Sequence, residues 1–181
     1  MILYIHGFAS CGNGNKSSIL KQFFGEDKVL SPDLPPEPKE AIKFLSNLIE
    51  KHSVKMLVGS SLGGYYSIHL AEKHDLKAVL INPALRPFES LNALVGKIRR
   101  YCDGFEFEWK REYIRQLIDL FTPKVEFSRY LVLLQTGDEL LNYEEAVNRF
   151  RCSKVVVEYG GNHRFENLDD YLYMIKNFYE R

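Results

Sequence analysis

The chain has 181 residues, 45% of them apolar and 27% charged, and its 24 basic and 24 acidic side chains give a net charge of zero. This size and composition are those of one globular domain with a full core. Balanced charge without a basic stripe argues against a nucleic-acid partner, and no apolar run reaches the length of a membrane span. The opening MILYIHGFAS lacks the basic leader and apolar length of a signal peptide, so we expect a cytoplasmic protein.

Short apolar runs recur along the chain, and each ends in small or polar residues. They are rich in Val, Ile and Leu without strict alternation, as in parallel strands covered on both faces. We predict strands at 2–5, 28–30, 55–58, 77–81, 130–135 and 154–159. Helical patterns lie between them, at 17–24, 39–51, 62–74, 143–150 and 168–179. This alternation predicts an α/β fold with a doubly wound, mostly parallel sheet.

One long stretch, between the strands at 77–81 and 130–135, interrupts the alternation. We expect residues 84–127 to form a helical cap insertion over one end of the sheet, within a single domain that spans 1–181. The alternative is that these are further core helices, because aromatic side chains at helical spacing more often belong to a core than to a site. The aromatic residues of this stretch are Phe88, Tyr101, Phe105, Phe107, Trp109, Tyr113 and Phe121, with Phe127 at its end.

The stretch KMLVGSSLGGYYSIHL crowds small residues between a predicted strand and a predicted helix. Gly59-Ser60-Ser61-Leu62-Gly63 fits the pattern G-x-S-x-G in that context, which is typical of a nucleophile elbow. Glycines two before and two after the serine avoid clashes with the neighbouring strand and helix. A glycine-rich turn without chemistry is the alternative interpretation. A serine hydroxyl is a weak nucleophile, so Ser61 as nucleophile requires a base and an acid from elsewhere in the chain.

Both partners follow in the order acid, then histidine. Asp138 comes just after the predicted strand 130–135, in the turn Thr136-Gly137-Asp138-Glu139, where the active edge of a parallel sheet lies. His163 follows two glycines after the last predicted strand and is the expected base, with Asp138 orienting its ring. Glu139 is the rival acid, and Asp33 and Asp119 are more distant alternatives. His52 and His74 end predicted helices and His69 lies within one, so they fit the base role less well.

Acyl transfer also requires hydrogen-bond donors for an oxyanion. One predicted donor is the backbone N–H of Leu62, directly after the nucleophile. The second is the N–H of Phe8, or of Ala9, in the loop His6-Gly7-Phe8-Ala9-Ser10 after the first strand. We interpret His6 as a structural brace of that loop rather than as a second base.

Two further patterns bear on possible chemistry. The cysteines Cys11, Cys102 and Cys152 form no CxxC pair and no zinc pattern, so we expect reduced thiols and no metal; Cys11 remains a nucleophile candidate without an activating partner. Gly14-Asn15-Lys16-Ser17 nearly matches a phosphate-binding loop, but Asn15 stands where that loop needs glycine. Nucleotide binding is therefore the weaker enzyme alternative.

Taken together, the motifs resemble those of the α/β-hydrolase superfamily, and within it the small YqiA-like esterases. The matching segments are YIHGFAS, GSSLGGYY, INPALRP, LLQTGDELLNYEEA and GGNHRFEN, which span nearly the whole chain. The resemblance implies a serine esterase with catalytic Ser61, Asp138 and His163, elbow glycines Gly59 and Gly63, and no metal or redox cofactor. It also implies a minimal fold without the first two strands of larger members, leaving six parallel strands in the order 2-1-3-4-5-6.

The expected reaction is hydrolysis of a small-molecule carboxylic ester or acyl thioester through an acyl-enzyme on Ser61. An acyl-CoA thioesterase and a non-catalytic binding protein on the same fold are the alternatives. An aromatic cap at 84–127 favours apolar acyl groups. No coiled-coil or obvious interface segment indicates an oligomer.

Overall fold

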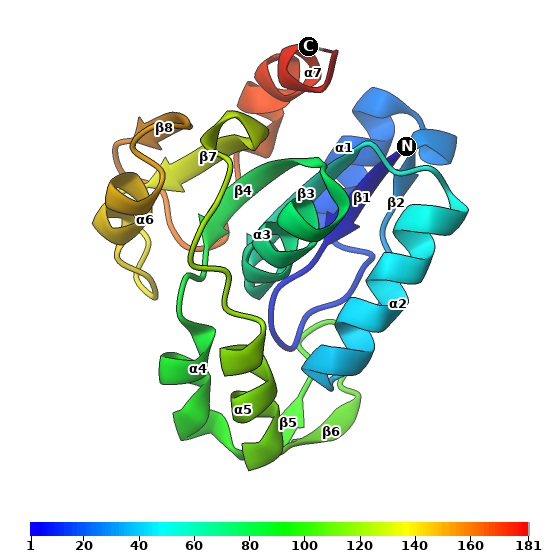
Figure 1. The fold of residues 1–181 in the computed structure, drawn as a ribbon, viewed down its shortest axis with the longest axis vertical. Helices are drawn as coiled ribbons and strands as arrows, with labels where there is room; N and C mark the ends of the chain where they lie inside the picture. Colours follow the sequence, from blue (N-terminus) through cyan, green and yellow to red (C-terminus); the bar gives the residue numbers. More distant parts are fainter. Residues whose placement is uncertain (181) are drawn as a thin grey trace.

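The protein is described by a computed structural model over residues 1–180, and its centre is a sheet of six parallel strands (Figure 1). The strands lie in the order β2-β1-β3-β4-β7-β8. Counting these six along the chain gives 2-1-3-4-5-6, so the predicted order and the all-parallel pairing are confirmed. The strands are β1 (Ile2–Ile5), β2 (Val29–Leu30), β3 (Met56–Ser61), β4 (Lys77–Pro83), β7 (Tyr130–Gln135) and β8 (Lys154–Glu158).

Helices cover both faces of this sheet (Figure 1). On one face lie α2 (Pro38–Lys51), α3 (Leu62–His74) and α6 (Tyr143–Arg149). The other face is covered by α1 (Asn15–Phe24) and α7 (Leu172–Glu180), with the short 3-10 turns η1 (Glu26–Lys28) and η4 (Leu168–Tyr171) leading away from α1 and into α7.

Local sequence explains where these helices start and stop. α2 begins with Pro38, whose fixed φ and missing N–H suit the first turn of a helix. α3 ends at Asp75, which adopts a left-handed conformation with φ 57°. The described helix bounds match the predicted ones to within a few residues, with 62–74 reproduced in full.

Alternate side chains of the strands enter two separate cores. Leu3, Leu57 and Leu80 point to the face covered by α2 and α3. Ile2, Val58 and Val79 point to the face covered by α1 and α7. Burial on both faces explains why the strands read as continuous apolar runs rather than as alternating ones.

Residues 84–127 lie at one end of the sheet, beyond the strand ends (Figure 1). They are not wholly helical. The segment contains α4 (Pro87–Ser90), the 3-10 turn η2 (Leu91–Leu94), an antiparallel hairpin of β5 (Gly96–Arg99) and β6 (Glu106–Trp109), and then α5 (Arg111–Asp119); the 3-10 turn η3 (Phe127–Arg129) leads into β7. The two hairpin strands have four residues each, and the chain turns back between them through Gly104, whose φ of 73° suits glycine.

The aromatic residues of this segment divide between core and surface. Trp109 is 1% exposed, and its indole N–H donates to the carbonyl of Leu91 at 3.2 Å. Tyr101 and Phe105, by contrast, are 86% and 54% exposed. Trp109 therefore belongs to the core, as the alternative interpretation of this stretch expected, whereas Tyr101 and Phe105 do not.

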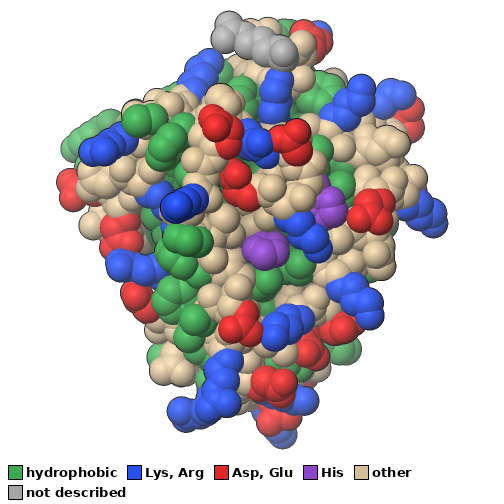
Figure 2. Space-filling model, viewed as in Figure 1, with side chains coloured by type: hydrophobic (Ala, Val, Ile, Leu, Met, Phe, Trp, Pro, Cys, Tyr) green, Lys and Arg blue, Asp and Glu red, His purple; other side chains and the backbone are tan. Residues whose placement is uncertain are grey.

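The molecular surface carries charges of both signs side by side. On the face seen in Figure 2, Lys and Arg side chains alternate with Asp and Glu side chains, with apolar groups between them. Within residues 1–180, no helix combines the length and apolarity that crossing a membrane requires.

Candidate active site

Ser61 occupies a strained turn between β3 and α3. Its backbone has φ 54° and ψ −120°, a conformation that a non-glycine residue rarely adopts. Such strain persists only where the surroundings enforce it, and it is common at functional sites. The turn places Ser61 at the N-terminal end of α3, where helix amides and the helix dipole favour negative charge.

The small residues around Ser61 are required by close backbone contacts. A Cβ on Gly63 would collide with the carbonyl of Ile5 in the neighbouring strand. A Cβ on Gly59 would collide with the Gly63 carbonyl and the hydroxyl of Ser67, and one on Gly64 would come within 2.7 Å of Pro83 Cβ. These contacts hold the turn tight enough to present the Ser61 side chain.

His163 lies between Ser61 and Asp138. Its Nε2 is 3.0 Å from Ser61 Oγ, and its Nδ1 is 2.8 Å from Asp138 Oδ2. The Asp138 side chain is 2% exposed and that of His163 15%. Asp138 Oδ1 also accepts the N–H groups of Leu140 and Leu141, both at 2.9 Å. The carboxylate is thus fixed on the imidazole from the side opposite Ser61.

The neighbouring Glu139 has a different role. Its Oε2 accepts the backbone N–H of His163 at 2.9 Å, so it supports the histidine loop rather than the ring. This hydrogen bond lowers the pKa of Glu139. The other alternative acids are engaged elsewhere: Asp33 with Gly12 and Arg100, and Asp119 with Lys39.

Two buried amides hold the His163 loop, and motif reasoning did not find them. Asn82 Nδ2 donates to the carbonyls of Asn162 and His163 at 3.1 and 3.3 Å, while its Oδ1 accepts the N–H of Gln135 at 3.0 Å. Gln135 Oε1 in turn accepts the N–H of Asn162 at 3.0 Å. Both amides are 2% exposed. Their signal in the sequence was a polar residue at the end of an apolar strand.

The loop after β1 lies against Ser61. A Cβ on Gly7 would be 3.3 Å from Ser61 Cβ, which is closer than an ordinary van der Waals contact. His6 is buried; its Nδ1 lies 2.8 Å from the Gly7 carbonyl, and its Nε2 accepts the N–H of Leu34 at 3.2 Å. Burial lowers the pKa of His6. His6 therefore braces this loop as a neutral ring.

The predicted oxyanion donors belong to the loop after β1 and to the start of α3, which both lie next to Ser61. Within residues 1–180, the N–H groups of Phe8 and Ala9 have no hydrogen-bond acceptor. Leu62 is the first residue of α3, where N–H groups lack partners within the helix. Ala9 has φ 51°, a second strained position in this loop.

Cys11 and Cys102 form a disulfide, which corrects the expectation of reduced thiols and removes Cys11 as a nucleophile candidate. The prediction was wrong because 91 residues separate the two cysteines and only the fold brings them together. Cys152 is free and exposed. In the near-match to a phosphate-binding loop, Lys16 Nζ donates to the Arg164 carbonyl, and Gly14 N–H donates to Ser17 Oγ at 2.9 Å.

The remaining histidines lie away from this constellation. His74 Nε2 is 3.0 Å from Ser46 Oγ, and His69 Nδ1 is 3.2 Å from the Leu120 carbonyl. Burial is the largest cause of the lowered pKa of each ring. His52 is the residue that follows the last turn of α2.

The fold is that of the α/β-hydrolase superfamily. The chain is similar to Est1E from Butyrivibrio proteoclasticus, solved with ferulic acid bound, with a TM-score of 0.70, 17% identity, and coverage of 98% of this chain and 86% of that one. It is also similar to a Paleococcus ferrophilus monoacylglycerol lipase, with a TM-score of 0.69, 15% identity, and coverage of 99% and 93%. At these identities the likeness establishes the fold alone.

Within that fold, the chain belongs to the uncharacterised protein family UPF0227, which it matches over residues 1–180. A relative is the UPF0227 protein YcfP of Escherichia coli O9:H4 (strain HS), 27% identical over 186 residues that cover 98% of each chain. The predicted resemblance is therefore confirmed at the level of the family and of the α/β-hydrolase fold.

Proposed function

We propose that the protein is a serine hydrolase that cleaves carboxylic esters through an acyl-enzyme on Ser61. One observation carries the proposal: His163 Nε2 lies 3.0 Å from Ser61 Oγ while its Nδ1 lies 2.8 Å from the buried Asp138 carboxylate. These contacts match a nucleophile, a base and an orienting acid. The monoacylglycerol lipase among the proteins of similar fold agrees with ester hydrolysis.

In the first step Ser61 Oγ attacks the ester carbonyl and its proton passes to His163 Nε2. The carbonyl oxygen becomes an oxyanion that the N–H groups of Leu62 and Phe8 stabilise. His163 then donates the proton to the departing alcohol oxygen, which leaves the acyl group on Ser61. Asp138 holds the imidazole in the required tautomer and stabilises its charged form.

In the second step water replaces the alcohol. His163 takes a proton from the water as its oxygen attacks the acyl-enzyme carbonyl, and then returns a proton to Ser61 Oγ as the acid leaves. Two buried amides, Asn82 and Gln135, keep the His163 loop in place through both steps, because they bind its backbone rather than its ring. These steps use only the side chains and backbone of the protein, the ester and water.

The proposal takes the cytoplasm as compartment and a small-molecule acyl ester as substrate. A thioester carbonyl would react by the same steps, so an acyl-CoA thioesterase is the alternative within this mechanism. Hydrolysis of p-nitrophenyl butyrate and of butyryl-CoA by the same preparation ranks the two. If kcat/KM is larger for butyryl-CoA than for p-nitrophenyl butyrate, thioesters rather than esters are the main substrate class.

The nucleophile is tested by comparing Ser61→Ala with Ser60→Ala on p-nitrophenyl butyrate. Ser60 is a matched control because it is the adjacent buried serine and lies outside the proposed triad. Ser61→Ala should lower kcat by about a thousandfold or more, and Ser60→Ala by only a few fold. A folded Ser61→Ala protein that keeps near-normal hydrolysis would refute the assignment.

A further inference from the structure

A pocket that opens to solvent lies between the loop after β1 and the β5–β6 hairpin. The short segment before α2 closes its third side. Its wall is mainly apolar and aromatic, formed by Phe8, Leu34, Pro35, Pro36, Leu62, Tyr66, Phe105, Phe107 and Trp109 together with residues 6, 7, 9, 10 and 100. The proposed triad residues Ser61, Asp138 and His163 do not line this pocket.

Within this wall, the Phe8 ring meets two other aromatic rings edge to face. The Phe8 ring centroid is 4.9 Å from that of Trp109 and 6.1 Å from that of Phe107. Arg100 is the one permanently charged lining residue, and its guanidinium binds Asp33 and Asp103. It also lies 4.9 Å from the centre of the Phe105 ring. Because Asp33 and Asp103 compensate the charge of Arg100, the pocket suits an apolar group, and its aromatic rings suit an aromatic group.

The position of the pocket relative to Ser61 indicates which part of an ester it would hold. Phe8 and Leu62, the proposed oxyanion donors, line it, and Gly7 connects it to Ser61. These residues follow β1 and β3, whereas His163 follows the edge strand β8, three strands away from β3 in the sheet. The alcohol must leave on the side of His163, which protonates it. The acyl group therefore extends to the opposite side, into the pocket.

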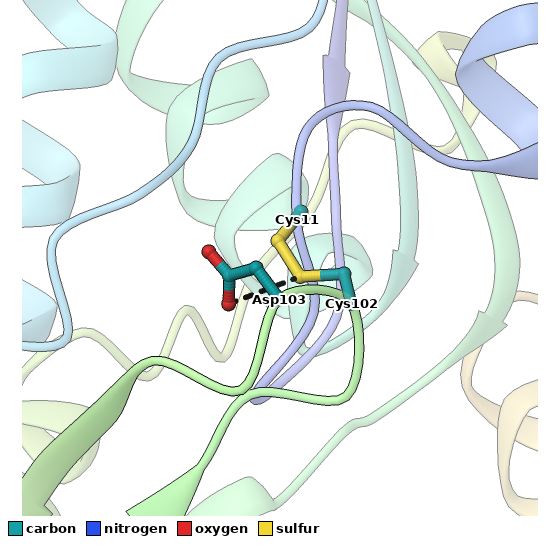
Figure 3. Close-up of side chains that lie close together, drawn as sticks. All are labelled: Cys11, Cys102 and Asp103. Atoms are coloured by element: carbon teal, nitrogen blue, oxygen red, sulfur yellow. Dashed lines mark hydrogen bonds between the residues drawn. A yellow bond between two sulfur atoms is a disulfide. The ribbon is translucent and has the colours of Figure 1, made fainter.

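Two opposite walls of the pocket are joined covalently. Figure 3 shows Cys11, from the loop after β1, bonded to Cys102, from the turn of the hairpin, with Asp103 beside them. Their Cα atoms are 6.2 Å apart, a usual separation for a disulfide. The Tyr101 N–H also donates to the Ala9 carbonyl at 2.9 Å. With the two sulfurs bonded to each other, these residues form a clasp rather than a set of thiolate metal ligands.

We infer that this pocket is the acyl site, that it takes aromatic acyl groups, and that the Cys11–Cys102 disulfide controls its selectivity by holding the hairpin against the loop. The inference rests on the proposed ester hydrolysis. With the disulfide closed, Phe105, Phe107 and Trp109 stay close to the acyl group. With it open, the hairpin is held by non-covalent contacts alone and an aromatic acyl group loses part of its wall.

The chemical step is thiol–disulfide exchange with a dithiol reductant. One thiolate of the dithiol attacks Sγ of the exposed Cys102, and the Cys11 thiolate leaves and takes up a proton. The second thiol of the reductant then displaces Cys102, so that two electrons pass to the protein and the dithiol becomes a disulfide. The cytoplasm, the predicted compartment, keeps most thiols reduced. The clasp would close there under oxidising conditions and raise the preference for aromatic acyl groups.

The test compares kcat/KM for p-nitrophenyl cinnamate, octanoate and acetate, which share one leaving group. It uses a Cys152→Ser background, because the exposed Cys152 would otherwise form bonds between molecules. For the oxidised protein, cinnamate should exceed both other esters, and dithiothreitol should lower the cinnamate-to-acetate ratio about five- to tenfold. The acetate rate should change less than twofold, since an acetyl group is too short to reach the hairpin.

Two variants separate the pocket from general damage to the fold. Phe107→Ala, with the disulfide intact, should lower the same ratio by a similar factor. Tyr101→Ala is the matched control, because that side chain is 86% exposed on the hairpin turn and does not line the pocket. It should leave the ratio unchanged. Peptide mapping with thiols blocked before unfolding should recover the Cys11–Cys102 cross-link from oxidised protein.

Three results would overturn the inference: no such cross-link, a ratio unaffected by dithiothreitol, or octanoate as the best substrate. Its failure is distinguishable from that of the proposed function. If acetate hydrolysis depends on Ser61 while the ratio is insensitive to reduction, only the inference about the pocket fails. If Ser61→Ala still hydrolyses acetate, the proposed function itself fails.

Discussion

Asn82, near the end of β4, binds the loop that carries His163: its Nδ2 donates to the carbonyls of both Asn162 and His163. Asn82 has φ 39°, a left-handed conformation that asparagine tolerates better than most residues. The same side chain accepts the N–H of Gln135, one of the last residues before the Asp138 turn. The Asn82 amide thus links the end of β7, which precedes Asp138, to the loop that carries His163.

Asn82→Asp should test that link with almost no change in size. Aspartate retains an acceptor for Gln135 but loses the donor to the His163 loop, so we expect kcat to fall about 10- to 100-fold with KM nearly unchanged. Asn82→Ala should show the same effect with an added loss of stability. Steady-state kinetics with a melting curve for each variant provide the measurement. A kcat within twofold of the parent in Asn82→Asp would show that the donor is dispensable.

Gly160 and Gly161 form a matched pair for the His163 loop. Both have positive φ, of 85° and 70°, so alanine is strained at either position. A Cβ on Gly160 meets open space, whereas one on Gly161 collides with the Gln135 side chain. Gly160→Ala should cost about 1–2 kcal/mol of unfolding free energy, and Gly161→Ala about 2–5 kcal/mol with a loss of activity. Equal urea midpoints for the two variants would contradict this packing.

Asp138 and Glu139 separate the two acidic roles. Asp138→Asn should lower kcat by about 10⁴-fold, because the amide no longer accepts from Nδ1–H of His163 and favours the wrong tautomer. Glu139→Gln should lower kcat by no more than a few fold, since the Glu139 side chain accepts the His163 backbone N–H rather than a ring nitrogen. Esterase assays on both variants decide the question. A larger loss for Glu139→Gln than for Asp138→Asn would reverse the assignment.

The buried His6 ring should make the free energy of unfolding depend on pH. Burial lowers its pKa in the folded state, so the unfolded chain binds more protons on acidification. The stability that neutral His6 contributes is complete above the pKa of about 6.5 that a histidine has in the unfolded chain. It is lost as the pH falls toward the lower pKa of His6 in the folded protein. Melting temperature should therefore fall between pH 7.5 and pH 5. His6→Gln should make that slope shallower, with the remainder due to His69 and His74, whose pKa values are also lowered. If His6→Gln leaves the slope of melting temperature against pH unchanged, His6 is not a cause of the pH dependence.

The sheet and the elbow could be predicted because their signals are local. Strands covered on both faces read as apolar runs, and α3 begins directly after the Gly-x-Ser-x-Gly stretch, as expected. The strand order, by contrast, followed from the family resemblance. The spacing of Ser61, Asp138 and His163 along the chain suggested their grouping because parallel strands share one carboxyl edge.

Other features depend on the tertiary fold and left no clear local signal. The hairpin at 96–109 has strands of four residues, too short for a firm period of two, and its aromatic residues also fit a helix. The Cys11–Cys102 bond joins positions 91 residues apart. The roles of Asn82 and Gln135 appear only when the ends of β4 and β7 lie beside the His163 loop.

The central claim is that Ser61 is an activated nucleophile, and covalent labelling tests it most directly. The folded protein is treated with a fluorophosphonate, its intact mass is measured, and the modified peptide is mapped, with Ser61→Ala as control. The account predicts one adduct, on Ser61, that is absent from the control. Folded protein that takes up no label, or takes it up elsewhere than on Ser61, would contradict the claim and favour a non-catalytic binding protein on this fold.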